Sequence, residues 1–154
     1  MKGIICILIM LSTCPLLTAD NDEEVRKELK ALQGKWRAVA VEAEGMPLPK
    51  DSFPAFTWVI ADDGKTTAQM PAGDFPVTIS VNPNKSPKTF VNLHGSGEQK
   101  RKKQYGIYKL EGDKLTVCQT FPGALEDDRP TDFTTKDTSN IIIVFERIKE
   151  DKRP

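Results

Sequence analysis

Histidine and cysteine are scarce in this chain of 154 residues, which has one histidine and three cysteines. A metal site made of several histidines is therefore excluded. Cys6 and Cys14 lie in the apolar N-terminal stretch, which leaves Cys118 as the one cysteine expected in the folded domain. A single cysteine forms no internal disulfide, so we expect no disulfide framework. We also expect no cofactor.

An excess of charge of one sign is also missing, because 22 Lys and Arg residues balance 22 Asp and Glu residues. No basic field points to a nucleic acid or an anionic membrane as partner. Charged residues make up 29% of the chain and hydrophobic residues 38%, as in soluble globular domains. The length is enough for a single domain with one core.

The chain lacks an apolar run long enough to span a membrane. Its longest run, residues 3–11 (GIICILIML), follows Lys2, and Pro15 interrupts what comes after it. A spanning helix needs about 20 apolar residues. A basic start, a short apolar stretch and the small residue Ala19 before Asp20 are typical of a secretory signal peptide. We expect residues 1–19 to be this leader and the mature protein to be periplasmic or extracellular.

Two alternatives for the leader remain open. Residues 11–14 (LSTC) resemble the processing box of bacterial lipoproteins, in which Cys14 would carry a lipid anchor. An uncleaved leader would instead be a membrane anchor. After simple cleavage we expect no membrane insertion.

A short helix should precede a series of strands. Residues 20–33 place Val25, Leu29 and Leu32 at helical spacing, with acidic residues first and basic residues later, as the helix dipole favours. Gly34 ends this helix. Residues 34–149 form the main domain and residues 150–154 a polar tail. The segments predicted as strands are 34–43, 56–61, 66–70, 75–81, 88–95, the two arms of 105–118, a short strand at 132–135, and 141–148.

Residues 105–118 (YGIYKLEGDKLTVC) predict a β-hairpin with its turn at Gly112 and Asp113. The paired positions are then Glu111 with Lys114, Leu110 with Leu115, and Tyr108 with Val117. The side chains expected in the core are Tyr108, Leu110, Leu115 and Val117, and those expected in solvent are Lys109, Lys114 and Thr116. We expect Cys118, on the second face, to be a packing residue rather than a reactive thiol.

About eight short strands without a long helix predict an antiparallel barrel or a sandwich. Segment 141–148 is apolar on both faces, which is unfavourable for a solvent-exposed edge strand of a sheet. Pairing it with segment 34–43 would remove both sheet edges at once. We therefore predict an all-β fold, an eight-stranded antiparallel barrel with a short N-terminal helix.

Three elements resemble those of lipocalin-like barrels. Residues 34–36 (GKW) match the G-x-W element, residues 131–133 (TDF) are similar to the later T-D-Y element, and Arg147 stands where these barrels have an arginine over the tryptophan. Such a stack is worth roughly 1 kcal/mol or more. The resemblance implies that Gly34, Trp36 and Arg147 are structural residues at the closed end of the barrel.

A wider resemblance covers most of the domain. Segments 32–49, 86–93, 105–118, 129–136 and 141–147 resemble, in this order, a family of small exported lipocalin-like domains that is abundant in planctomycete bacteria and has no assigned activity. The resemblance implies a fold and an extracytoplasmic location. It supplies no catalytic residues.

The chain shows no catalytic or metal motif. His94 precedes residues 95–97 (GSG), which lack the G-x-S-x-G spacing of a nucleophile elbow, and we interpret it as a solvated residue at a strand end. The basic run 100–103 (KRKK) and the acidic run 126–128 (EDD) are interpreted as solvated surface.

The larger aromatic residues could line a ligand cavity or fill the barrel, since an eight-stranded barrel is wide enough for either. We expect packing for most of them. The residues concerned are Trp36, Trp58, Phe90, Tyr108 and Phe145.

Together these observations favour a non-enzymatic domain outside the cytoplasm that binds a small apolar molecule. The alternative is a protein-interaction module at the cell envelope, such as an inhibitor that contacts a hydrolase through its loops and N-terminal segment.

The leader makes a testable prediction. Mass spectrometry of the exported protein should give an N-terminus near Asp20 and no added lipid, because signal peptidase removes the leader. An intact Met1, or a lipid on Cys14, would contradict simple cleavage.

Overall fold

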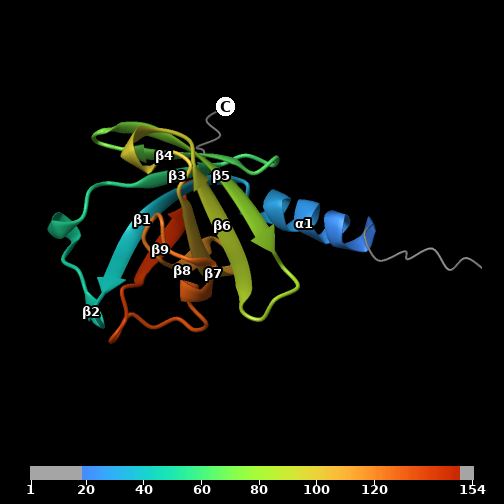
Figure 1. Ribbon diagram of the computed structural model, residues 1–154. Helices are drawn as coiled ribbons and strands as arrows, with labels where there is room; N and C mark the ends of the chain where they lie inside the picture. Colours follow the sequence, from blue (N-terminus) through green and yellow to red (C-terminus); the bar gives the residue numbers. More distant parts are fainter. Residues whose placement is uncertain (1–18, 150–154) are drawn as a thin grey trace, which may run out of the picture.

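Strand pairing closes a β-barrel in the computed structural model, which describes residues 19–149 (Figure 1). The barrel strands are β1 (Gly34–Ala43), β3 (Thr57–Ile60), β4 (Lys65–Met70), β5 (Gly73–Asn82), β6 (Lys88–His94), β7 (Lys103–Glu111), β8 (Lys114–Gln119) and β9 (Ile141–Arg147). Each is antiparallel to the next, and β9 returns to pair with β1. A ninth strand, β2 (Met46–Pro47), extends the sheet beside β1. The predicted eight-stranded barrel is confirmed.

The expectations for the leader, for Cys14 and for the polar tail fall on residues 1–18 and 150–154, which lie outside the described part of the chain. Within residues 19–149, no helix combines the length and the apolar character that crossing a bilayer requires.

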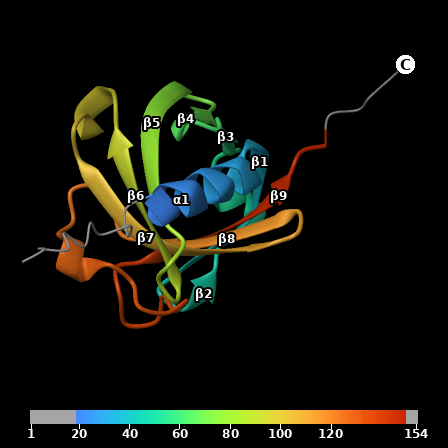
Figure 2. The same ribbon diagram turned by 90° about the vertical axis from the view of Figure 1, so that its right-hand side faces the viewer.

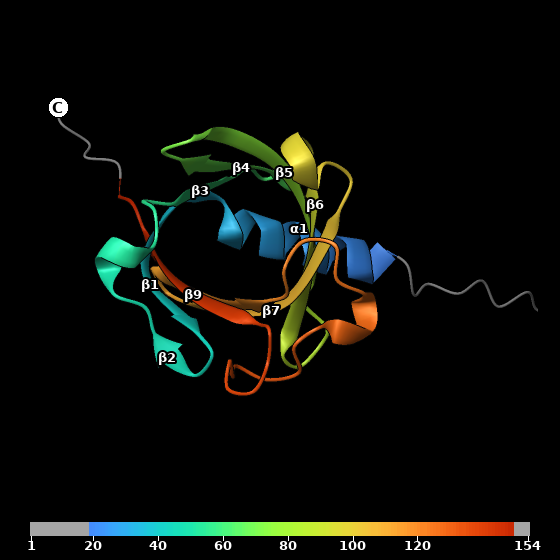
Figure 3. The ribbon, with the colours of Figure 1, turned by 60° about the vertical axis from the view of Figure 1, so that its left-hand side comes forward.

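Helix α1 (Ala19–Leu32) lies across one end of the barrel (Figure 2). The predicted helix is confirmed, with both ends one residue earlier. Val25 and Leu29 pack against the barrel core, and Leu32 is buried in it. Glu28 ties the helix to the wall, since its carboxylate accepts hydrogen bonds from Tyr108 Oη at 3.1 Å and Lys88 Nζ at 2.8 Å. The helix therefore closes this end, while Figure 3 shows the opposite end with α1 behind it.

Trp36 and Arg147 join the helix to the first and last strands. They are paired across β1 and β9, and the Arg147 guanidinium lies 4.0 Å from the centre of the indole ring. The same guanidinium donates hydrogen bonds to the carbonyls of Ala31 and Gln33, where the helix ends. Trp36 Nε1 donates to Leu32 O at 2.8 Å. The predicted stack is present and also holds the end of α1.

Gly34 has two reasons to be glycine. Its φ of +131° lies in a region that side chains disfavour. A Cβ atom built there would lie 2.9 Å from Arg147 Nη1. The position therefore lets the chain turn from α1 into β1 directly beneath the guanidinium.

The hairpin has the predicted register, with Tyr108 opposite Val117 and Leu110 opposite Leu115. Tyr108, Leu115 and Val117 are buried inside the barrel, whereas Leu110 is half-buried near the turn.

Two expectations are wrong, one for the loop before β9 and one for the outer face of the hairpin. Residues 132–135 form no strand, and Thr116 is buried with 7% of its surface exposed. Phe133 packs outside the barrel on Ile107, Cys118 and Ile142, so the loop before β9 covers the outer face of β7, β8 and β9, which Thr116 shares with Cys118. Thr135 fixes this loop by donating to Glu42 Oε1 at 2.6 Å.

Cys118 is a packing residue in this outer cluster. Its side chain is fully buried and faces the carbonyl oxygen of Thr134 at 3.8 Å. Burial, reinforced by the negative charges of Asp132 and Glu42, raises the pKa of the thiol to about 11. The thiolate, which is the reactive form, is therefore absent near neutral pH.

The stack of Arg147 on Trp36 can be tested with a double-mutant cycle. Trp36→Ala and Arg147→Ala should each destabilise the protein. The double variant should lose less stability than the sum of the two single losses, by about 0.5 kcal/mol or more, because both changes remove the same contact. The free energy of unfolding in urea measures this. A cycle of Trp36 with Lys103, which is exposed at the far end of β7, is the control and should be additive. Strict additivity of the first cycle would contradict the contact.

The register of the hairpin is tested by two neighbouring positions. Leu115→Ala should cost roughly 2 to 5 kcal/mol of stability, because it removes a large buried side chain. Lys114→Ala, at an exposed position, should change stability by no more than about 0.5 kcal/mol. Chemical denaturation gives both values, and a stable Leu115 variant beside an unstable Lys114 variant would show that the faces are reversed.

Candidate functional site

The barrel is hollow at the end opposite α1, where it holds a cavity of about 450 Å³. Small side chains at inward positions leave this space, among them Ala38 and Ala68. The half of the barrel nearer α1 is filled instead. There, Gly106 gives room to the Phe90 ring, because a Cβ atom at position 106 would collide with this ring.

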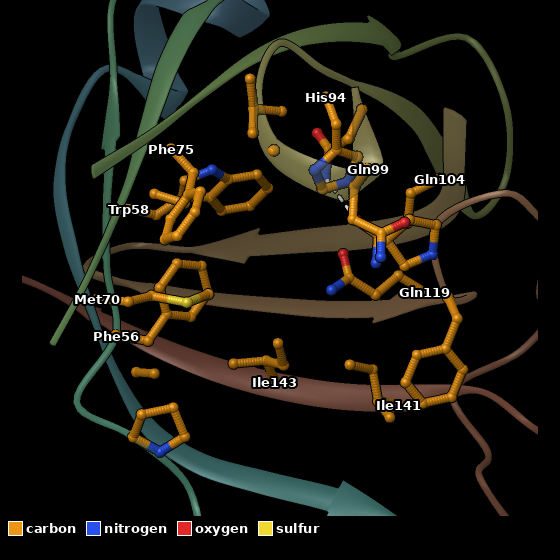
Figure 4. A pocket seen from close by; sticks show the side chains of 18 of the residues that line it. Phe56, Trp58, Met70, Phe75, His94, Gln99, Gln104, Gln119, Ile141 and Ile143 are labelled. Atoms are coloured by element: carbon orange, nitrogen blue, oxygen red, sulfur yellow. Dashed lines mark hydrogen bonds between the residues drawn. The ribbon is translucent and has the colours of Figure 1, made fainter. Parts of the chain in front are cut away.

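One wall of the cavity is aromatic. Phe56, Trp58 and Phe145 form a continuous cluster, with ring centres 5.4 Å apart for Phe56 and Phe145 and 5.6 Å apart for Trp58 and Phe145. Phe75 and Met70 extend this wall toward the open end (Figure 4). A wall of ring faces and edges suits a flat or aromatic apolar molecule.

Some of the aromatic residues singled out in the sequence line the cavity, and the others fill the core. Trp58 and Phe145 line the cavity, whereas Trp36, Phe90 and Tyr108 belong to the filled part of the core. Burial, followed by the charge of Glu28, raises the pKa of Tyr108 well above its usual value, so that its hydroxyl stays protonated and donates to Glu28.

A β-bulge in β1 shapes the cavity. The pairing of β1 with β9 shifts between Ala38 and Ala40, so that Ala38 pairs with Phe145 and Val41 pairs with Ile143. Ala38 and Val41 therefore both line the cavity, although they are three residues apart, and Ala40 is exposed outside the barrel. Simple alternation along the strand would have placed Ala40 inside.

The wall opposite the aromatic cluster is polar, as Figure 4 shows for His94, Gln99, Gln104 and Gln119. Gln104 lies at the centre of a hydrogen-bond network. Its Nε2 donates to Thr120 O at 2.7 Å, and its Oε1 lies 3.4 Å from Asn92 Nδ2 and 3.3 Å from His94 Nε2. Adjacent strands β6 and β7 thus present a set of neutral amides and one imidazole to the cavity.

His94 ends β6 as predicted, but the expectation that it is solvated is wrong, because its half-buried side chain forms part of this polar wall. Burial lowers the pKa of His94, against the opposing effect of the hydrogen bond to Gln104. The imidazole is therefore neutral near pH 7. Its hydrogen-bond partner is an amide oxygen rather than a carboxylate or a serine hydroxyl, which is not the arrangement of a catalytic triad.

Two buried oxygen atoms in the polar wall have no hydrogen-bond partner within the described part of the chain. They are Asn92 Oδ1 and Gln99 Oε1, and both residues line the cavity. Buried polar atoms are normally paired, so an unpaired acceptor beside a cavity marks a place where a ligand or water can donate.

The charged runs noted in the sequence lie outside the cavity. All four residues of the run 100–103 are exposed, and so are the three residues of the run 126–128. Within the acidic run, Glu126 pairs with Arg129 at 3.1 Å and Asp128 accepts a hydrogen bond from the backbone of Leu125. Among residues 19–149 no group of three His, Cys, Asp or Glu side chains is placed to hold a metal ion.

The sequence contains one signal for the polar wall, in the alternation along β6. Phe90, Asn92 and His94 alternate along β6 and therefore share its inward face. A polar Asn92 at an inward position between two larger rings is unusual for a packed core. Gln104 could not have been placed beside it without the register of β6 and β7.

Comparison of the chain with models of protein families, with curated proteins and with solved structures finds no match.

Proposed function

We propose that this protein binds one small, largely apolar molecule in the open end of its barrel. The observation that carries the proposal is the cavity of about 450 Å³, which lies within the usual size range of small-molecule sites. Its lining combines an aromatic wall with a few polar groups, which is the usual composition of such sites. Its residues come from many strands of a closed barrel, so the site is formed before the ligand arrives.

The proposal retains a non-enzymatic role. The cavity brings together neutral amides, a neutral imidazole and aromatic rings, and His94 is hydrogen-bonded to Gln104. These groups suit recognition of a ligand. The likeness to exported lipocalin-like domains and the leader composition support a location outside the cytoplasm, where such a protein would carry or sequester its ligand.

A protein-interaction module is the second candidate. Phe121 and Leu125 are 56% and 71% exposed on the loop after β8, and Phe121 also lies at the cavity mouth. Exposed apolar residues on a loop can anchor a partner. A stable complex with an envelope protein that persists when the cavity is filled would favour this second function.

The first test uses N-phenyl-1-naphthylamine, an uncharged probe whose fluorescence rises in apolar surroundings. The parent protein should bind it, and Ala38→Phe should weaken binding about tenfold or more, because a phenyl ring then occupies the cavity. Ala40→Phe is the matched control on the same strand, since Ala40 is exposed outside the barrel. Equal binding by both variants, or no binding by the parent, would contradict the proposed site. Thermal unfolding checks that both variants fold.

The two tryptophans of the chain locate the probe. Trp58 lines the cavity, whereas its cross-strand partner Trp36 lies in the filled core, so the probe should quench Trp58 more strongly than Trp36. The Trp58→Phe variant should therefore bind the probe with weaker tryptophan quenching than the Trp36→Phe variant.

A further inference from the structure

The polar wall of the cavity has a definite hydrogen-bond direction. The carbonyl oxygen of Thr120 can only accept, so the Gln104 side chain must turn its Nε2 toward it. Gln104 Oε1 then faces Asn92 and His94, and both of these must donate to it. The orientation of one amide thus fixes that of its two neighbours.

Asn92 and His94 each keep one hydrogen-bond acceptor atom that Gln104 does not use. Asn92 uses Nδ2 on Gln104, and its Oδ1 is buried without a partner while the whole residue is only 4% exposed. His94, when neutral, donates through Nε2 and therefore has a bare lone pair on Nδ1. Gln99, on the short helical turn 97–99 above β6, adds the unpaired Oε1.

From this arrangement we infer that the ligand is an uncharged molecule with an apolar, preferably aromatic, body and at least one O–H or N–H group that donates to Asn92 Oδ1 or Gln99 Oε1. This inference rests on the proposed function and specifies its ligand. A molecule without a donor would leave the buried acceptors unpaired, and sites of this kind discriminate strongly against such analogues.

The same wall disfavours acids. Among residues 19–149 the lining includes no lysine or arginine, and Glu98 is the one charged residue in it. A carboxylate in the cavity would have no cation of the described lining beside it, and it could not donate to Asn92 Oδ1 or Gln99 Oε1. Long-chain fatty acids, which fill many apolar cavities, are therefore unsuited to this one unless their carboxylate stays in solvent.

Three probes that share one ring system test the inference by displacing N-phenyl-1-naphthylamine at pH 7. They are 2-naphthol, which donates through its hydroxyl, 2-methoxynaphthalene, which only accepts, and 2-naphthoate, which is an anion. We expect 2-naphthol to bind about fivefold more tightly than 2-methoxynaphthalene, and 2-naphthoate to bind most weakly. Equal affinities of 2-naphthol and 2-methoxynaphthalene, or tighter binding of 2-naphthoate, would overturn the inference.

Variants connect the preference to its atoms. Asn92→Leu and Gln99→Leu each remove one unpaired acceptor, and at least one of them should bring the affinity ratio of 2-naphthol to 2-methoxynaphthalene close to one. Thr116→Val is the control, because it makes a similar polar-to-apolar change at a buried position outside the barrel and should keep the ratio. An unchanged ratio in both cavity variants would overturn the assignment.

The outcomes separate this inference from the proposed function. If all three probes displace N-phenyl-1-naphthylamine with equal affinity, the cavity binds ligands but does not select donors, and only the inference fails. If N-phenyl-1-naphthylamine itself does not bind to the parent protein, the proposed function fails and the inference fails with it.

Discussion

The contact of Arg147 with Trp36 is the constraint on which the remaining structure depends. One guanidinium covers the indole, pairs with Asp113 in the hairpin turn at 3.3 Å, and donates to the last carbonyls of α1. A cation at a helix C-terminus is favoured by the helix dipole, and its planar fork can serve several acceptors at once. The first strand, the last strand and the helix therefore meet at one point. This junction closes one end of the barrel and leaves the opposite end for the cavity.

The closed barrel could be predicted from the sequence because its causes are local or follow from simple pairing rules. Alternation in residues 105–118 fixed the hairpin register, and the apolar segment at the C-terminus required a partner on both sides. The resemblance to lipocalin-like barrels placed Trp36 and Arg147 together. Each of these signals depends on the period of a strand or on the order of elements along the chain.

The cavity and the outer loop could not be predicted in the same way. A cavity is the difference between the space inside the barrel and the volume of its side chains, and alternation indicates only which way a residue points. The bulge in β1, which brings Val41 inside, has no signal in the residue pattern. The outer face of the hairpin at Ile107 and Cys118 is covered by Phe133, a residue of a distant loop. The polar wall likewise combines residues of β6 and β7 that meet only in the folded protein.

The central claim is that the open end of the barrel is a ligand site while the Trp36 end is solid. The most direct test is a nuclear magnetic resonance titration with N-phenyl-1-naphthylamine that follows the two indole N–H signals and the side-chain amides of Asn92 and Gln99. The account predicts that the signals of Trp58, Asn92 and Gln99 shift together and saturate at one equivalent, while Trp36 stays in place. Shifts centred on Trp36, or no saturable shift at Trp58, would contradict it.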